Sequence, residues 1–110
     1  NTLALYIQNT GTSVAGGNVV QSCIFNNYYS PAPGVILFGD STGNLIYNCS
    51  FFGAASRGIW TTVVNCVQVY NSLFCGYYSN GALGASASGQ ITSNYNRFIV
   101  SGTVYFPMIT

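Results

Sequence analysis

The chain has 110 residues, of which 49% are hydrophobic and 3% are charged, and its formal net charge at pH 7 is +1. This length and apolar content suit one domain, residues 1–110, and exclude a disordered chain, which would be poor in apolar residues and rich in charge. The charged fraction lies far below the roughly 25% of ordinary soluble domains, so little electrostatic repulsion keeps copies of the chain apart.

Short apolar strands recur along the chain, separated by Gly, Asn, Ser and Thr. The first is expected at residues 3–7, where apolar side chains alternate. Four later segments align without gaps: NVVQSCIF (18–25), NLIYNCSF (44–51), VQVYNSLF (67–74) and ITSNYNRF (91–98). These apolar runs are much shorter than the roughly 18 residues that a membrane-spanning helix needs, so no membrane span is expected.

The alignment contains three repeated columns, and a fourth column lies ahead of the aligned segments. The last position is always phenylalanine, at steps of 26, 23 and 24 residues: Phe25, Phe51, Phe74 and Phe98. Five places earlier stand Val20, Ile46, Val69 and Ser93. Two places before each phenylalanine is a small polar residue: Cys23, Cys49, Ser72 and Asn96. A glycine opens a short apolar strand 16 or 17 residues ahead of a phenylalanine at Gly34, Gly58 and Gly81.

A period in the low twenties, with short β-strands and no helical spacing, indicates a chain that coils above itself. We therefore predict an all-β fold, a single-stranded parallel β-helix (β-solenoid) of four to five coils with about 24 residues per coil. Equivalent residues would stack roughly 4.8 Å apart. Within a coil, Ile46 and Phe51 would both face inward because the Asn48-Cys49 pair bends the chain between them.

The repeated unit, an apolar residue followed by small polar residues and phenylalanine and preceded by Gly-Val or Gly-Ile, resembles the repeat of right-handed parallel β-helix proteins. That pectate-lyase-like superfamily includes polysaccharide lyases, phage tailspikes and surface proteins. The resemblance covers about residues 18–106. It implies the fold and leaves the function open.

The sequence lacks the side chains that catalysis needs. Its acidic and basic residues are Asp40, Arg57 and Arg97, and it has no histidine. Glycoside hydrolysis needs two carboxylates, and a Ser or Cys nucleophile needs a base, so we expect no enzyme and no cofactor. Two arginines are too few for nucleic-acid binding, which depends on neutralising several phosphates.

Four cysteines and one N-glycosylation triplet favour an oxidising, extracellular location. Cys23 and Cys49 share a column, so a disulfide between neighbouring coils is a candidate, with two stacked reduced thiols as the alternative. Cys66 and Cys75 are a second candidate pair. The cysteine spacing and the lack of histidine argue against a metal site. Asn48 is the candidate glycosylation residue.

The sequence at both ends of the chain predicts a β-strand and not a polar cap. Solenoids usually cap their end coils, which otherwise expose unpaired backbone and apolar cross-sections. We therefore expect a secreted, cell-surface or virion-surface structural subunit that stacks head-to-tail with copies of itself into a filament. The expected subunit interface contains Leu3, Leu5, Ile7, Val104, Tyr105 and Phe106.

Two alternatives remain open. The first is a glycan-binding β-helix segment of a phage tailspike or adhesin, in which exposed aromatic side chains stack on sugar rings. Its candidate aromatic residues also suit a core or a contact between copies: Tyr28, Tyr29, Trp60, Tyr77 and Tyr78. The second is an unrelated all-β sandwich of pilin type, which would leave the phenylalanine column unexplained.

Overall fold

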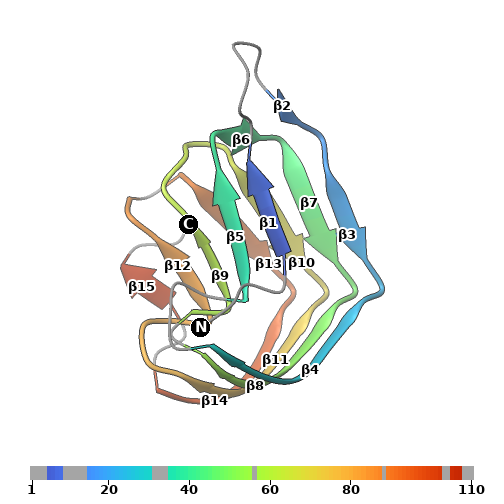
Figure 1. The fold of residues 1–110 in the computed structure, drawn as a ribbon, viewed down its shortest axis with the longest axis vertical. Helices are drawn as coiled ribbons and strands as arrows, with labels where there is room; N and C mark the ends of the chain where they lie inside the picture. Colours follow the sequence, from blue (N-terminus) through green and yellow to red (C-terminus); the bar gives the residue numbers. More distant parts are fainter. Residues whose placement is uncertain are drawn as a thin grey trace.

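In the computed structural model, the chain winds into stacked coils of parallel β-strands (Figure 1). The structure describes residues 5–8, 15–30, 35–55, 57–87, 89–102 and 105–107. The principal extents of the molecule are 38 × 27 × 26 Å. Within the described part, no helix has the length and apolar character that a membrane crossing requires.

Three parallel sheets surround the core (Figure 1). Sheet 1 consists, in spatial order, of β1 (Leu5–Gln8), β5 (Ile36–Gly39), β9 (Ile59–Thr61), β12 (Leu83–Ala85) and β15 (Tyr105–Pro107). Sheet 2 consists of β3 (Val19–Gln21), β7 (Asn44–Tyr47), β10 (Val67–Tyr70) and β13 (Ile91–Asn94). Sheet 3 consists of β4 (Ile24–Ser30), β8 (Ser50–Ala55), β11 (Leu73–Tyr78) and β14 (Arg97–Gly102). A short pair joins β2 (Ala15–Gly16) to β6 (Ser41–Thr42).

The predicted parallel β-solenoid is confirmed, with slightly fewer turns than expected. Each four-stranded sheet contains three stacking steps, so the coil makes about three turns and not four to five. The four aligned segments supply one strand each to sheets 2 and 3, which gives four stacked levels with three steps between them. The period of about 24 residues holds in the middle of the molecule, whereas the step from Leu5 to Ile36 in sheet 1 is 31 residues.

The phenylalanine column is a stack of rings inside sheet 3. Phe25, Phe51, Phe74 and Phe98 are paired in register on consecutive strands. Successive ring centroids lie 4.8, 4.6 and 5.2 Å apart, with interplanar angles of 11°, 4° and 13°. The strand spacing sets these distances, because each ring is carried one coil above the last. The predicted alignment of these residues along one axis is therefore confirmed.

The bend between sheets 2 and 3 is made by one residue in each coil with a positive φ angle. The four residues, each three places before a phenylalanine, have φ between 51° and 56°: Ser22, Asn48, Asn71 and Tyr95. Asparagine tolerates this left-handed conformation better than most residues, which explains its presence in the two middle coils. Tyr95 adopts the same φ without that preference, so the stacked coils and not the local sequence determine the bend there.

The glycine column reflects a close approach of neighbouring coils before sheet 1. A Cβ atom on Gly58 would lie 2.4 Å from the carbonyl oxygen of Ala82 in the next coil. The Gly58 N–H donates a hydrogen bond to the Gly81 carbonyl at 3.2 Å. A side chain at position 58 would separate these backbones. Gly34, the first member of the predicted column, lies outside the described residues.

Candidate functional site

In the phenylalanine column, the inward-facing side chains of the two end coils are more exposed than those of the middle coils, whereas in sheet 2 the inward Val20 of the first coil and Ile91 of the last coil are buried. In the phenylalanine column, Phe51 and Phe74 are 1% and 0% exposed. Phe25 and Phe98, in the first and last coils of the same column, are only partly buried. The side chain is the same at all four positions, so the difference in burial comes from the position in the stack.

Sheet 1 has the same gradient at its amino-terminal edge. Ile36 and Ile59 are fully buried, whereas Leu5, which pairs in register with Ile36, is only partly buried. Ile7 is likewise partly buried, and its register partner Phe38 is 2% exposed. The first coil therefore leaves part of its apolar interior accessible.

The predicted interface residues that the structure describes lie at the two opposite edges of sheet 1. Leu5 and Ile7 belong to β1, and Tyr105 and Phe106 belong to β15 (Figure 1). All strands of this sheet run parallel, so the two edge strands, β1 and β15, point in the same direction. Two of the predicted residues lie outside the described part of the chain: Leu3 and Val104.

The small polar column forms hydrogen bonds between coils. The Cys49 N–H donates to Ser72 Oγ at 3.3 Å, and the Ser72 N–H donates to Asn96 Oδ1 at 2.9 Å. Asn96 Nδ2 donates to the Val69 carbonyl at 2.8 Å and to Ser93 Oγ at 2.9 Å. Each coil thus satisfies a backbone donor of the coil below it at the bend.

Neither candidate disulfide is present, because all four cysteines have free thiols. The Cys49 thiol is buried and donates to the Val20 carbonyl at 3.6 Å, and the Cys23 thiol is exposed and donates to the Gln21 carbonyl at 3.2 Å. Cys23 and Cys49 are therefore reduced thiols, which is the alternative to the disulfide.

The second pair is also unbridged. Cys66 lies buried directly before β10, whereas Cys75 is partly exposed within β11. Burial raises the pKa of the Cys66 and Cys49 thiols, so both are less acidic than ordinary cysteines. Within the described residues, no cluster of three or more His, Cys, Asp or Glu side chains could hold a metal ion.

Asn48, the candidate glycosylation residue, is exposed at the bend between sheets 2 and 3. Its φ of 55° places it at the tip of the turn, and the following Cys49 is buried. The amide therefore faces solvent in the folded chain. Attachment of a glycan at Asn48 remains a prediction from the triplet.

Among the described residues, the candidate aromatic side chains do not form one exposed row. Tyr78 is buried, with its ring edge against Phe74 at a centroid distance of 6.4 Å. Trp60 is partly buried, and the Arg57 guanidinium lies over its ring at 4.0 Å from the centroid. Tyr77 is exposed but lies on sheet 3, whereas Trp60 lies on sheet 1. The side chains of two other candidates lie outside the described part: Tyr28 and Tyr29.

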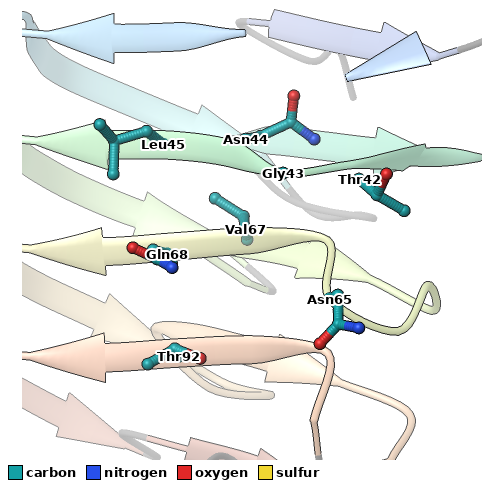
Figure 2. A pocket seen from close by; sticks show the side chains of 8 residues that line it. All are labelled: Thr42, Gly43, Asn44, Leu45, Asn65, Val67, Gln68 and Thr92. Carbon is teal, nitrogen blue, oxygen red and sulfur yellow. The ribbon is translucent and has the colours of Figure 1, made fainter. Parts of the chain in front are cut away.

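An uncharged groove of about 550 Å³ runs along the outer face of sheet 2, at the corner where the chain enters this sheet (Figure 2). Leu45, Gln68 and Thr92 lie one above another on consecutive strands, in register. Thr42 and Asn65 border the groove at the corner. The groove therefore offers hydroxyl and amide groups and no charge.

A buried asparagine network at the same corner was not predicted. Asn44 is 2% exposed, and its Nδ2 donates to Ser41 Oγ at 2.8 Å and to the Cys66 carbonyl at 3.0 Å. Asn44 Oδ1 accepts hydrogen bonds from the N–H and the Nδ2 of Asn18, at 3.2 and 2.9 Å. A signal was available, since Asn18 and Asn44 open the first two aligned segments.

Comparison of the chain with protein-family models, curated proteins and solved structures finds no match in any of the three.

Proposed function

We propose that this chain is a non-catalytic structural subunit that stacks head-to-tail with copies of itself into a filament. The observation that carries the proposal is the burial gradient of the phenylalanine column and of the first strands of sheet 1: Phe51, Phe74, Ile36 and Phe38 are buried, whereas Phe25, Phe98, Leu5 and Ile7 at the end coils are partly exposed. Covering an apolar end coil with another coil removes that surface from water, which is the main favourable contribution to association.

Head-to-tail stacking also uses the parallel direction of the strands. The two edges of sheet 1 are strands β1 and β15, so β1 of one copy can extend the sheet of the copy before it. Such a contact joins two different surfaces and does not close, so it produces a filament instead of a closed oligomer. The low charge of the chain supports this assembly, because stacked copies repel each other little.

The proposed location of the filament is outside the cell, on a cell surface or on a virion surface. The exposed Asn48 triplet supports this location, since N-glycosylation occurs in secreted proteins. The free thiols of this structure give it no support, because disulfides are the usual mark of an oxidising compartment.

The first experiment is electron microscopy of the purified, concentrated chain without partners. The expected result is regular fibres with a repeat of about 4.8 Å along the fibre axis, the spacing of stacked parallel strands. Monomers or closed trimers under the same conditions would contradict the proposal.

A pair of variants in β1 tests the joint. Ile7→Lys places an ammonium group on the partly buried inward face of the end coil, where a stacked copy would desolvate it, so fibres should be lost. Tyr6→Lys is the matched control, because it adds the same charge to the neighbouring residue, whose side chain is 51% exposed. Fibres of Ile7→Lys as abundant as those of the wild type would remove β1 from the joint.

Mixing separates a blocked joint from a misfolded subunit. A folded Ile7→Lys subunit keeps its other end, so a small fraction added to wild-type protein should bind fibre ends and shorten the fibres. Misfolded subunits would leave fibre length unchanged, and thermal unfolding of the variant reports the same difference directly.

A second candidate function, glycan binding, is favoured by the uncharged groove on sheet 2. Its volume lies in the range of small-molecule sites, and its amide and hydroxyl groups can hydrogen-bond sugar hydroxyls. Gln68→Ala should then weaken binding of a neutral oligosaccharide about tenfold in calorimetric titration, while Asn94→Ala, on the same sheet outside the groove, should not. Absence of heat with wild-type protein over a panel of neutral oligosaccharides would reject this candidate.

A further inference from the structure

The outer face of sheet 3 carries an apolar surface that the head-to-tail proposal does not use. On its strands, the residues that alternate with the inward phenylalanine column face outward. We define the sheet 3 outer patch by six of these outward residues: Ile24, Phe52, Leu73, Cys75, Tyr77 and Ile99.

Several side chains of the patch are largely in contact with water. Ile24 is 69% exposed, and Tyr77 and Ile99 are each 50% exposed. Phe52 and Cys75 lie in register with Ile99 and are partly exposed, so three consecutive strands present an apolar row. The largest exposed apolar patch of a monomer is often a functional surface, and patches beyond a few hundred Å² mark interaction sites.

We infer that the sheet 3 outer patch is a lateral contact between two copies of this chain. The charge of the patch favours a second copy, because Arg97 at one side is its one charged neighbour on the outward face of the described strands. Nucleic acids and anionic surfaces would require several basic residues. The row of Phe52, Cys75 and Ile99 also offers few hydrogen-bonding groups to a polar ligand.

The area of the patch indicates how strong the contact between two copies is. Four strands spaced by about 4.8 Å and about five residues of about 3.3 Å each give the outward face an area on the order of 300 Å². The apolar patch is smaller, because Ser50, Arg97 and Ser101 occupy outward positions on the same strands. A stable interface buries about 800 Å² per partner, so one pair of copies would be held weakly. In a filament the patch recurs with every subunit, and simultaneous contacts strengthen each other. The inference rests on the proposed function for this repetition only.

Cross-linking through Cys75 tests the contact directly. A two-fold contact brings the centre of the patch against its own copy, and packed sheets lie about 10 Å apart, within reach of a short bismaleimide. The test variant is Cys23→Ser, in which Cys75 is the remaining accessible thiol because Cys49 and Cys66 are buried. We expect covalent dimers linked at Cys75. The control carries Cys23→Ser, Cys75→Ser and Asn94→Cys, which moves the accessible thiol to the outer face of sheet 2, and should yield no dimer.

A charge pair tests the same surface without cysteine chemistry. Ile99→Lys introduces a charge into the patch and should lower the Cys75 cross-linking yield about tenfold and separate laterally paired fibres. Asn94→Lys adds the same charge to an exposed position in the same coil, on sheet 2, and should change neither.

The outcomes distinguish the two proposals. Single, unpaired fibres without Cys75 dimers would overturn the lateral contact and leave head-to-tail stacking intact. Cys75 dimers without fibres would support the lateral contact and contradict the stacking. Binding of the patch to phosphatidylcholine vesicles, lost in Ile99→Lys and without Cys75 dimers, would assign the patch to a membrane surface and overturn the inference.

Discussion

At the scale of single residues, the stacked phenylalanine side chains provide much of the packing between coils. Phe51 lies between Phe25 and Phe74, with ring centroids 4.8 and 4.6 Å away, and is 1% exposed. Offset or parallel aromatic pairs contribute beyond the area that they bury. The adjacent Phe52 alternates to the outside of the same strand, and it stacks on no aromatic ring among the described residues.

Replacing Phe51 by alanine should therefore destabilise the fold strongly. The loss of a fully buried phenylalanine costs about 3 to 5 kcal/mol of unfolding free energy, because the transfer energy is lost and a cavity remains. Phe52→Ala, the neighbouring change on the outward face, should cost about 1 kcal/mol or less. Chemical denaturation of both variants measures the difference, and equal losses would show that the column does not stabilise the coils.

Tyr78 predicts a loss of stability at alkaline pH. Burial, with a smaller contribution from the negative charge of Cys75, raises the pKa of Tyr78 to about 12. Its stabilising contribution is complete below the unfolded-state value of about 10 and declines as the pH rises through 12, because the unfolded phenol loses its proton first. The unfolding free energy should fall by about 2 to 3 kcal/mol over this window.

Denaturant titrations at several alkaline pH values check this expectation. The Tyr78→Phe variant keeps the ring and removes the ionisable group, so its stability should decline less steeply. The buried thiols of Cys49 and Cys66 have raised pKa values and add a decline of the same sign in both proteins. Parallel pH profiles for the wild type and Tyr78→Phe would refute the assignment to Tyr78.

At the scale of elements, a pair of glycines leaves no room for a side chain between two neighbouring strands of sheet 3. Gly53 and Gly76 pair in register, and Gly76 has a φ of 138°, which residues with a side chain rarely adopt. A Cβ atom on Gly76 would lie 1.8 Å from the Gly53 carbonyl oxygen. The strand pair can keep its spacing only while position 76 has no side chain.

Gly76→Ala should therefore displace β11 from β8 and destabilise the fold by about 3 kcal/mol or more. Gly39→Ala is the control, because a Cβ atom there meets its nearest neighbour, the Gln8 side chain, at an ordinary 3.5 Å. The control should change stability by at most about 0.5 kcal/mol in thermal or chemical unfolding. A tolerated Gly76→Ala change would mean that the two strands are not held in this register.

The element scale also marks the limit of sequence-based prediction. The column through Phe25 and Phe51 predicted the register of sheet 3, since identical residues at a constant step must repeat the same environment. The disulfide between Cys23 and Cys49 was not found although both lie in one column. Stacking brings two cysteines close, but the orientation of their side chains decides whether a disulfide can form. The spacing of the cysteines in the sequence does not specify that orientation.

At the scale of the whole molecule, the near absence of charge should make the proposed assembly insensitive to simple salt. The chain has three charged side chains among 110 residues, so screening has few interactions to weaken. Fibre yield and unfolding free energy should change little, by less than about 0.5 kcal/mol, between about 10 mM and about 500 mM sodium chloride. Sedimentation assays over this range measure the yield.

Ammonium sulfate provides the contrast at equal ionic strength. Sulfate is excluded from protein surfaces and strengthens apolar burial, so it should promote assembly where sodium chloride does not. A steep dependence on sodium chloride would instead indicate that charged contacts hold the copies together.

The sequence by itself determined the architecture of this protein. A repeat of apolar, small polar and phenylalanine positions at a nearly constant step is satisfied when equivalent residues stack, because each coil then buries its inward side chains against the next. The tertiary structure alone decided which aromatic side chains face water, that the thiols stay free, and where the apolar patch and the uncharged groove lie. These features depend on side chains from different coils meeting across strands, and a linear spacing does not specify how they are oriented when they meet.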